Sequence, residues 1–403
     1  TTRLRSGAQD SSAINVFIDG VGQKNYVLPG GVSGQDSTRG NPFPQAAIGE
    51  YKVITSNYKA EYDQLGSAAI TAVTRSGSNE FGGSFFWDRT STDWRAPTEG
   101  EEASGEKAEF REEQYGASFE GPIIRDRLQF FLAYEAKEYV SPRSVVPGQG
   151  FASTPGLLPA ELQPLVGTFS SPFKQDMYFG KLSWLPGDAH LVELTAKVRE
   201  ETELGNFDGT RTLMYGSAKD NDDRRLDLRY QFSGKRFLND FHVGYEDASW
   251  RPRAYTLAPG YVLTTANPND VILQAGGGPD FQDKGQKGWS LQNDLTLNSF
   301  EWSGSHTIKM GVKFKDIDIT SLEQNPYNAQ YYYDLGQDTS IPYQVRFGAP
   351  VGEATGGVTT SGKQYGLYIQ DDWEVNEHLT LNLGLRWDYE TNPAYTGYVT
   401  PAD

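Results

Sequence analysis

The chain has 403 residues, of which 37% are hydrophobic and 13% aromatic, with no Cys and a formal net charge of −17 at pH 7. The lack of Cys excludes disulfide scaffolds, thiol enzymes and Cys-based metal sites, and the acidic balance argues against a nucleic-acid partner, which would need a basic face. No stretch approaches the roughly 18 consecutive apolar residues of a membrane-spanning helix, so the aromatic-rich composition favours a β-rich chain.

The first part of the chain predicts a small separate module, which we assign to residues 1–79. Short strands are expected at 14–20, where an Asp-Gly turn ends the run, and at 47–55 and 67–75. The third run consists largely of small residues, which suit close packing inside a larger structure.

From about residue 80 the sequence alternates between apolar and polar residues. The clearest run is 378–390, where Leu379, Leu381, Leu383, Leu385, Trp387 and Tyr389 alternate with polar residues or glycine. Successive side chains of a strand point to opposite faces, so this pattern predicts a strand with one apolar face. Eleven such strands are expected, at 81–89, 114–121, 127–137, 175–185, 190–200, 222–233, 236–250, 287–300, 305–319, 363–374 and 378–390.

The connections between these strands are alternately short and long. The short ones are 122–126, 186–189, 234–235, 301–304 and 375–377, and the long ones are 90–113, 138–174, 201–221, 251–286 and 320–362. Strands that match the about 9 to 11 residues needed to cross a bilayer, with one plain rim and one elaborate rim, indicate an outer-membrane β-barrel. We therefore expect an all-β, up-and-down antiparallel transmembrane barrel.

The tryptophans support this interpretation, because most of them fall near strand ends or in short turns. An indole ring favours the membrane interface, where its apolar body and its N–H group are both satisfied. Chance scattering through a soluble β-sandwich is the alternative. The predicted interface aromatic residues are Trp87, Trp184, Trp250, Trp289, Trp302, Trp373, Trp387 and Tyr389.

Two segments resemble TonB-dependent outer-membrane transporters, and most of all their Oar-like branch. Residues 14–20, 48–53 and 62–83 are similar to the family's plug motifs IDG, IExxEV and GGxINxxTKSG, although Ser67-Ala68 replaces the glycine pair, Thr71 the Asn and Arg75 the Lys. Residues 364–390 are similar to the barrel hairpin motif YxQDxW…LxLGLRYD. The matches follow the family's order along the chain.

The resemblance implies an α+β plug inside a barrel of about 22 strands. Eleven strands would then be the first half of the barrel, 80–403, preceded by the C-terminal part of the plug, 1–79. It also implies a location in the outer membrane of a Gram-negative bacterium, contact with lipid and lipopolysaccharide, and a TonB-type coupling protein that binds an upstream segment. The chain is expected to be a portion of a longer protein.

The resemblance also assigns roles to individual residues. Glu50 and Arg75 match plug positions that contact the barrel wall. The loop 22–45 is a candidate plug apex with Gln35, Asp36 and Arg39, with an ordinary polar connection as the alternative. The polar residues expected to face the lumen are Arg199, Arg229, Arg386 and Asp388.

Little in the sequence indicates catalysis. The four His residues are far apart, no HExxH motif is present, and no Cys or Ser elbow completes a nucleophile site. We expect no enzyme, no catalytic residue, no metal site and no cofactor, with Ca²⁺ bridging by acidic outer loops as an alternative.

The leading hypothesis is therefore transport of a large or scarce, unidentified substrate, gated by the plug and energised from the inner membrane. Two alternatives remain. The barrel could anchor long loops that bind a surface partner protein, for which the aromatic cluster in 320–362 is a candidate, or it could be a secretion route for a protein or peptide.

Overall fold

The computed structural model describes residues 6, 9, 13–24, 26, 39–97, 101–102, 105, 107–148, 158–265, 270–337 and 339–391. These residues form three sheets: one of eleven strands and two of four strands each. We call the eleven-stranded sheet the wall, and the described residues before residue 80 the N-terminal module. No helix in the described ranges is long and apolar enough to cross a membrane.

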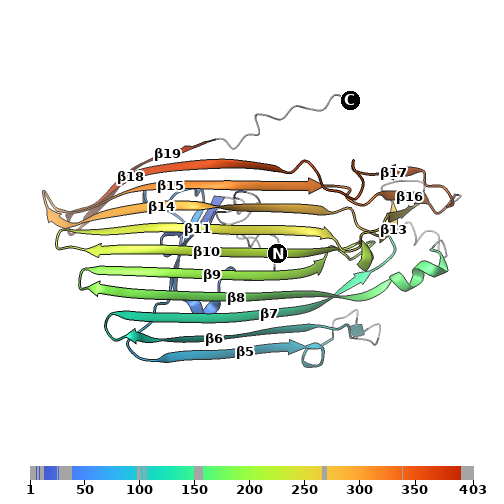
Figure 1. Cartoon of the computed structure of the whole chain (residues 1–403), viewed down its shortest axis with the longest axis horizontal. Helices are drawn as coiled ribbons and strands as arrows, with labels where there is room; N and C mark the ends of the chain where they lie inside the picture. Colours follow the sequence, from blue (N-terminus) through green and yellow to red (C-terminus); the bar gives the residue numbers. More distant parts are fainter. Residues whose placement is uncertain are drawn as a thin grey trace.

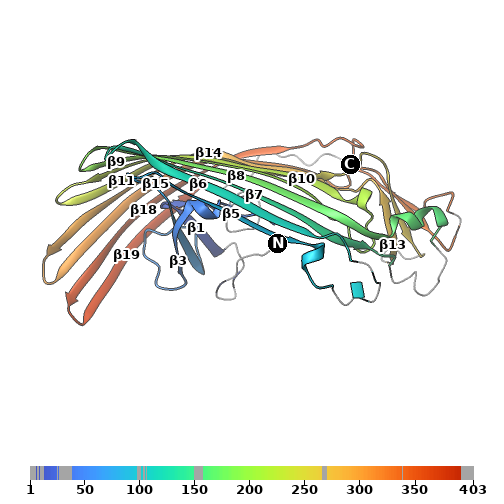
Figure 2. The ribbon, with the colours of Figure 1, turned by 90° about the horizontal axis from the view of Figure 1, so that it is seen from below.

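The wall is an antiparallel meander in which every strand pairs with its neighbours along this set (Figure 1). All eleven strands predicted from the alternation are confirmed, and most extend further than predicted towards the long connections. They are β5 (Gly82–Ser91), β6 (Arg111–Ile124), β7 (Leu128–Val145), β8 (Gly167–Gly187), β9 (His190–Gly205), β10 (Ser217–Ser233), β11 (Phe237–Ala254), β14 (Phe281–Glu301), β15 (Ser305–Gln324), β18 (Val358–Asn376) and β19 (Leu379–Glu390). The sheet curves into a trough (Figure 2), and β5 and β19 form its two edges.

The two faces of the wall are inverted relative to a soluble protein. On β9 the charged side chains of Lys197 and Arg199 are 2% and 0% exposed, whereas Leu194 is 39% exposed. On β19 Leu385 is 72% exposed. Burying unpaired charge is costly and exposing leucine to water is unfavourable, so this pattern excludes a water-surrounded sandwich. The convex face is the apolar one and the concave face is the polar one.

The N-terminal module is a four-stranded sheet on the concave side of the wall (Figure 2). Its strands are β1 (Ile14–Ile18), β2 (Val21–Gly22), β3 (Ile48–Ile54) and β4 (Ala68–Thr74), in the order β2-β1-β4-β3. The three predicted strands are confirmed, β1 and β4 run parallel, and β2 is an addition. The module also contains the 3₁₀ turn η2 (Gln45–Ala47).

Four of the long connections fold together into a cap, which the sequence analysis treated as loops. Its sheet contains β12 (Gly260–Thr264), β13 (Val271–Gly276), β16 (Gln330–Asp334) and β17 (Gln344–Arg346), in the order β13-β12-β16-β17. The cap and the neighbouring ends of β7 and β9 share an apolar core made of Val145, Leu158, Phe207, Leu263, Ile272 and Leu273. The cap lies at the end of the trough opposite the short turns (Figure 1).

Truncation of the cap core should open the cap without unfolding the wall. Leu273 is fully buried, so Leu273→Ala is expected to cost about 2–5 kcal/mol locally. Hydrogen exchange of residues 260–276 should accelerate in this variant. Leu257→Ala, at a side chain that is 77% exposed, is the matched control and should change little; unchanged exchange in Leu273→Ala would contradict a cooperatively packed cap.

Candidate functional site

The contact between the N-terminal module and the wall is the candidate site, and charge pairs dominate it. Three module carboxylates meet cations on the concave face. Asp19 lies 3.1 Å from the Lys181 ammonium, Glu61 pairs with Lys309, and Asp63 pairs with Lys313 and lies 3.7 Å from Arg386.

The opposite arrangement occurs at three other points, where module cations meet wall carboxylates. These ion pairs are Arg39 with Glu203 at 3.3 Å, Lys59 with Asp372 at 2.6 Å, and Arg75 with Glu120 at 3.1 Å. The surfaces are therefore complementary in charge along the whole length of the contact. Such pairs can be exchanged for water or for another charged group. Separation of a continuous apolar interface would instead expose apolar surface to water, which is unfavourable.

The local backbone orients the Asp19 carboxylate towards the wall. It occupies the left-handed region with φ 49° in the turn after β1, a conformation that Asp tolerates better than most residues. Its carboxylate accepts hydrogen bonds from the Thr74 backbone N–H at 2.8 Å and from the Thr74 hydroxyl at 2.5 Å. The same carboxylate accepts from Lys181, so one side chain joins β1, β4 and the wall.

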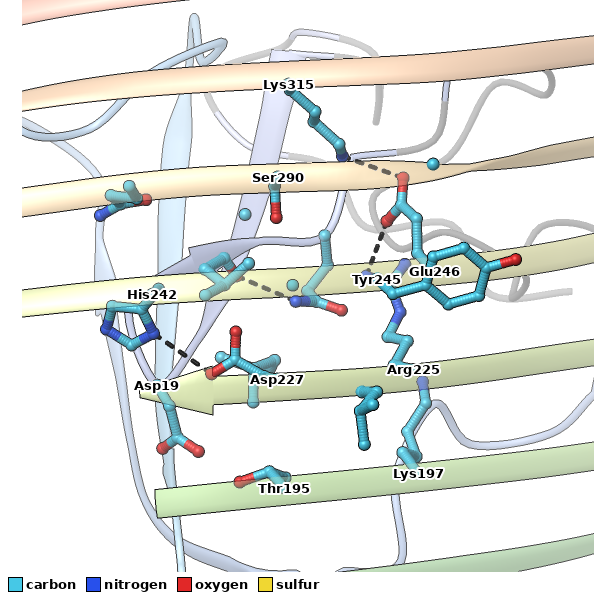
Figure 3. Close-up of a pocket in the computed structure, with 18 of the residues that line it drawn as sticks. Asp19, Thr195, Lys197, Arg225, Asp227, His242, Tyr245, Glu246, Ser290 and Lys315 are labelled. Atoms are coloured by element: carbon cyan, nitrogen blue, oxygen red, sulfur yellow. Dashed lines mark hydrogen bonds and ion pairs between the residues drawn. The ribbon is translucent and has the colours of Figure 1, made fainter. Parts of the chain in front are cut away.

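A cavity of about 60 Å³ separates part of the module from the wall (Figure 3). Charged side chains from β9, β10, β11 and β15 surround it and form two chains of ion pairs. In one, Arg225 links Asp223 to Glu246, which also binds Lys315 at 3.0 Å. In the other, His242 lies between Asp227 at 3.2 Å and Asp240 at 3.3 Å. Asp19 and Phe43 contribute to the module side of this cavity.

An apolar contact supplements the charges. Phe43 and Ala47 of the module pack with Phe131, Ala133 and Phe179 of the wall. The Lys197 ammonium lies 4.2 Å from the centre of the Phe43 ring, which adds a cation–π contact. On the wall side the apolar residues of this contact come from β7 and β8, and the lysine comes from β9.

The module segment 58–64 contacts the wall at β15, β18 and β19. The Glu61 backbone N–H donates to Gln370 at 3.1 Å, and Arg386 donates to the Ala60 carbonyl at 3.2 Å. The approach is close because β19 has a glycine there: a Cβ on Gly384 would lie 3.0 Å from the Ala60 Cβ.

Asp63 is buried in this contact. Burial alone would raise the pKa of Asp63, but the Lys313 ammonium, the Arg386 guanidinium and the Lys315 ammonium outweigh that effect, so its pKa lies below the usual value for Asp. The carboxylate is therefore ionised at neutral pH and needs its cationic partners.

The sequence-predicted module residues have different surroundings. Arg75 reaches Glu120, and its guanidinium lies 5.2 Å from the centre of the Phe131 ring. Glu50 is exposed, and its side chain makes no hydrogen bond or ion pair with any other described residue. Arg39 contacts Glu203 and also donates to Ser141 at 3.2 Å. Gln35 and Asp36 lie outside the described residues.

The four residues predicted to face the lumen lie on the concave face. Arg229 binds Asp240 at 2.7 Å and Glu193 at 3.1 Å. The Arg386 guanidinium forms an ion pair with the Asp388 carboxylate at 2.7 Å. Arg199 is fully buried, and its guanidinium lies 4.0 Å from the Glu201 carboxylate. They form part of the charged lining rather than an isolated path.

Seven of the eight predicted interface aromatic residues lie on the convex face or in a short turn. Trp184, Trp302 and Trp373 are near the short turns, where the Trp373 ring stacks on His306 at 5.2 Å. Trp289 lies further from the short turns, and the centre of its ring is 4.9 Å from that of Tyr245. Trp87, Trp387 and Tyr389 also lie away from the short turns. The convex face thus carries two aromatic groups, separated by exposed aliphatic side chains.

The prediction for Trp250 is wrong. It follows Tyr245 by five positions in a strand without a bulge at this point, so the two side chains point to opposite faces. Trp250 lies on the concave face, where the Lys284 ammonium is 5.9 Å from its ring centre. Position near a strand end suggested an interface role, but strand parity determines the face.

Sequence analysis missed the module carboxylates Asp19, Glu61 and Asp63 and the wall residue Lys181. A weak signal existed: the charges at 59, 61 and 63 alternate with other residues, as in an extended segment docked on one side. In the described ranges no group of three or more His, Asp or Glu residues is arranged to hold a metal ion.

Comparisons with known proteins agree with this geometry. The family described as outer membrane beta barrel domain matches residues 73–155 and 147–398. The TonB-dependent transporter Oar of Myxococcus xanthus is 24% identical over 472 residues, covering 96% of this chain and 44% of Oar. The outer membrane transporter YddB from Escherichia coli has a TM-score of 0.66 at 16% identity, covering 95% of this chain and 49% of YddB.

A mutant of the ferric enterobactin receptor PfeA from Pseudomonas aeruginosa has a TM-score of 0.61 at 14% identity, over 94% of this chain and 50% of that one. The chain therefore spans about half the length of the proteins that it matches. By their descriptions these proteins are transporters and receptors.

Removal of Lys181 should loosen the module. Lys181→Met leaves Asp19 without its ammonium partner, and losing one member of a buried pair costs about 3–5 kcal/mol. Lys174→Met is a matched control on the same strand, because its pair with Asp176 has the same 3.1 Å separation but the Lys174 side chain is 56% exposed. The urea concentration at which a protease cleaves residues 13–79 should fall for Lys181→Met and not for Lys174→Met. Equal falls in the two variants would contradict a stabilising role of the buried Asp19–Lys181 pair.

Acid should release the segment 58–64. Because the folded-state pKa of Asp63 is lowered, its contribution to stability is present above its unfolded-state pKa of about 3.9 and is lost as the pH falls through the lower folded-state value. A spin label on an Asn57→Cys variant should become more mobile in that acidic range. Asp63→Asn should remove most of the pH dependence; an unchanged profile would contradict the assignment.

Proposed function

Because this chain belongs to the outer membrane beta barrel domain family, we propose that it is part of a TonB-dependent transporter in which the N-terminal module is the plug. The wall lies in the outer membrane of a Gram-negative bacterium, with its convex apolar face towards lipid. Residues 1–79 then form the C-terminal part of the plug, and residues 80–403 form the first half of the barrel. The substrate is a large or scarce solute that needs a gated route.

One observation carries this proposal: a folded module sits in the concave side of the wall and is held mainly by exchangeable charge pairs. A purely structural filler would be expected to pack through apolar contacts, which give stability without the cost of burying charge. Charged contacts keep the route closed at rest, yet a moderate pulling force can replace each of them with water. A TonB-type partner, which would bind an upstream segment of the longer protein, is the proposed source of that force.

A second function is favoured by the cap. Tyr343 and Phe347, which are 45% and 62% exposed, flank β17, and the cap that contains β17 is held by an apolar core from four connections. A rigid platform with exposed aromatic residues suits recognition of a partner at the cell surface. The wall and module would then act as an anchor. The same platform is compatible with export of a protein or peptide, so the direction of movement has to be measured.

A reversible crosslink tests whether the module must move. The natural chain has no Cys, and the 3.0 Å separation at Ala60 and Gly384 is close to the about 3.5–4.5 Å that a disulfide requires between Cβ atoms. In the full-length protein, Ala60→Cys with Gly384→Cys should block transport when oxidised and restore it on reduction. The single Cys variants are the controls.

The readout compares solutes in the growth medium and periplasm of cells that carry each variant. An import substrate should accumulate in the medium of oxidised double-variant cells and of cells without the coupling protein. Accumulation in the periplasm would instead support export. Identical medium and periplasm in all strains would contradict transport and favour the surface anchor.

A further inference from the structure

Among the described residues, two lysines on the concave face form no ion pair with a wall carboxylate. The ion pairs of Lys309 and Lys313 within the described ranges are with Glu61 and Asp63 of the module. Lys315 differs, because it pairs with Glu246 on the wall. Arg386 is intermediate, because it pairs with Asp388 on the wall and also lies 3.7 Å from Asp63 of the module. The wall therefore carries local positive charge that the module neutralises.

Glycines allow close packing at this place, because Gly311, Gly366 and Gly384 present no side chain to the concave face of β15, β18 and β19. The space over two of them is filled by the wall itself. A Cβ on Gly311 would come within 2.3 Å of the Asp294 carboxylate and 2.4 Å of the Tyr368 ring, and a Cβ on Gly366 within 2.5 Å of the Arg386 guanidinium. The third, Gly384, faces Ala60 of the segment 58–64, whose carboxylates pair with the lysines.

We propose that Lys309, Lys313 and Arg386 form a binding site for solutes that carry carboxylate or phosphate groups. Glu61 and Asp63 occupy this site while the module is docked on the wall. The proposal rests on the transport function proposed above and names its substrate class. In this view the plug segment imitates the ligand. Solute anions replace the plug carboxylates when the module moves.

The physical reason is the cost of unpaired charge. Lys313 and Asp63 have side chains that are 14% and 6% exposed, so separating them without a replacement leaves poorly hydrated charges. An anionic solute restores the pairing, whereas a neutral or cationic solute does not. A concave, low-dielectric surface with uncompensated positive charge also concentrates anions near it.

Planar bilayers with the full-length protein provide the first test, using a KCl gradient as the probe. Glu61→Gln with Asp63→Asn removes the imitating carboxylates, and the resulting channel should conduct chloride severalfold better than potassium and be blocked by citrate. Lys59→Gln is the matched control, because it loosens the same segment but exposes Asp372 instead of cations. Adding Lys309→Gln and Lys313→Gln to the double variant should abolish the chloride preference.

A double variant without chloride preference would overturn the proposal, as would a preference that survives loss of both lysines. The wild-type protein gives a second test that needs no altered folding. Citrate should lower the urea concentration at which residues 57–66 become open to protease, more than sodium chloride of equal ionic strength, and Lys309→Gln with Lys313→Gln should remove the difference. Equal effects of the two salts would also overturn it.

Both tests use purified protein without an energy-coupling partner. They can therefore fail while coupled transport remains established in cells, and they can succeed if the crosslink experiment finds no transport. The two proposals are separable on this basis.

Discussion

The burial of charge on the concave face is the constraint on which the rest of this structure depends. Lys181, Lys197, Arg199 and Glu193 are almost fully buried, so each must find an opposite charge or a hydrogen bond. The wall supplies part of this pairing within itself, through the chains around Arg225 and His242. The N-terminal module supplies a further part, for example through Asp19 to Lys181, which explains why its surface carries charges of both signs at matching positions. Module and wall are thus specified by each other.

Much of the fold follows from alternation along the sequence, for a clear reason. In a wall with lipid on one face and polar groups on the other, each residue faces one of two environments. The alternation of apolar and polar residues in runs such as 378–390 indicates which face each residue occupies. All eleven wall strands and three strands of the module could therefore be predicted. The assignment of Trp250 is wrong because the face that a strand residue occupies depends on its parity, here relative to Tyr245, and not on its distance from the strand end.

The partners across the interface could not be predicted in the same way. Asp19 and Lys181 are 162 positions apart, and Lys313 and Asp63 are 250 apart, so no local pattern links them. The cap was missed for a related reason. Strands such as β12 and β16 have five residues each and pair in parallel although their partners are 70 positions apart. Their stability comes from a core shared by distant connections. Arg75 was found because a resemblance placed it, and the structure supplies Glu120 as its partner.

The distance in sequence between the segment 58–64 and its docking strands has a consequence for biogenesis. Glu61 and Gln370, which form a hydrogen bond, are 309 positions apart in the chain, and the module emerges from the ribosome well before β15, β18 and β19. Neighbouring wall strands pair with their sequence neighbours and can therefore insert hairpin by hairpin. The module can contact β6 to β9 as soon as those strands have formed. The docking site of the segment 58–64 is incomplete until β19 is in place, so this part of the contact forms last.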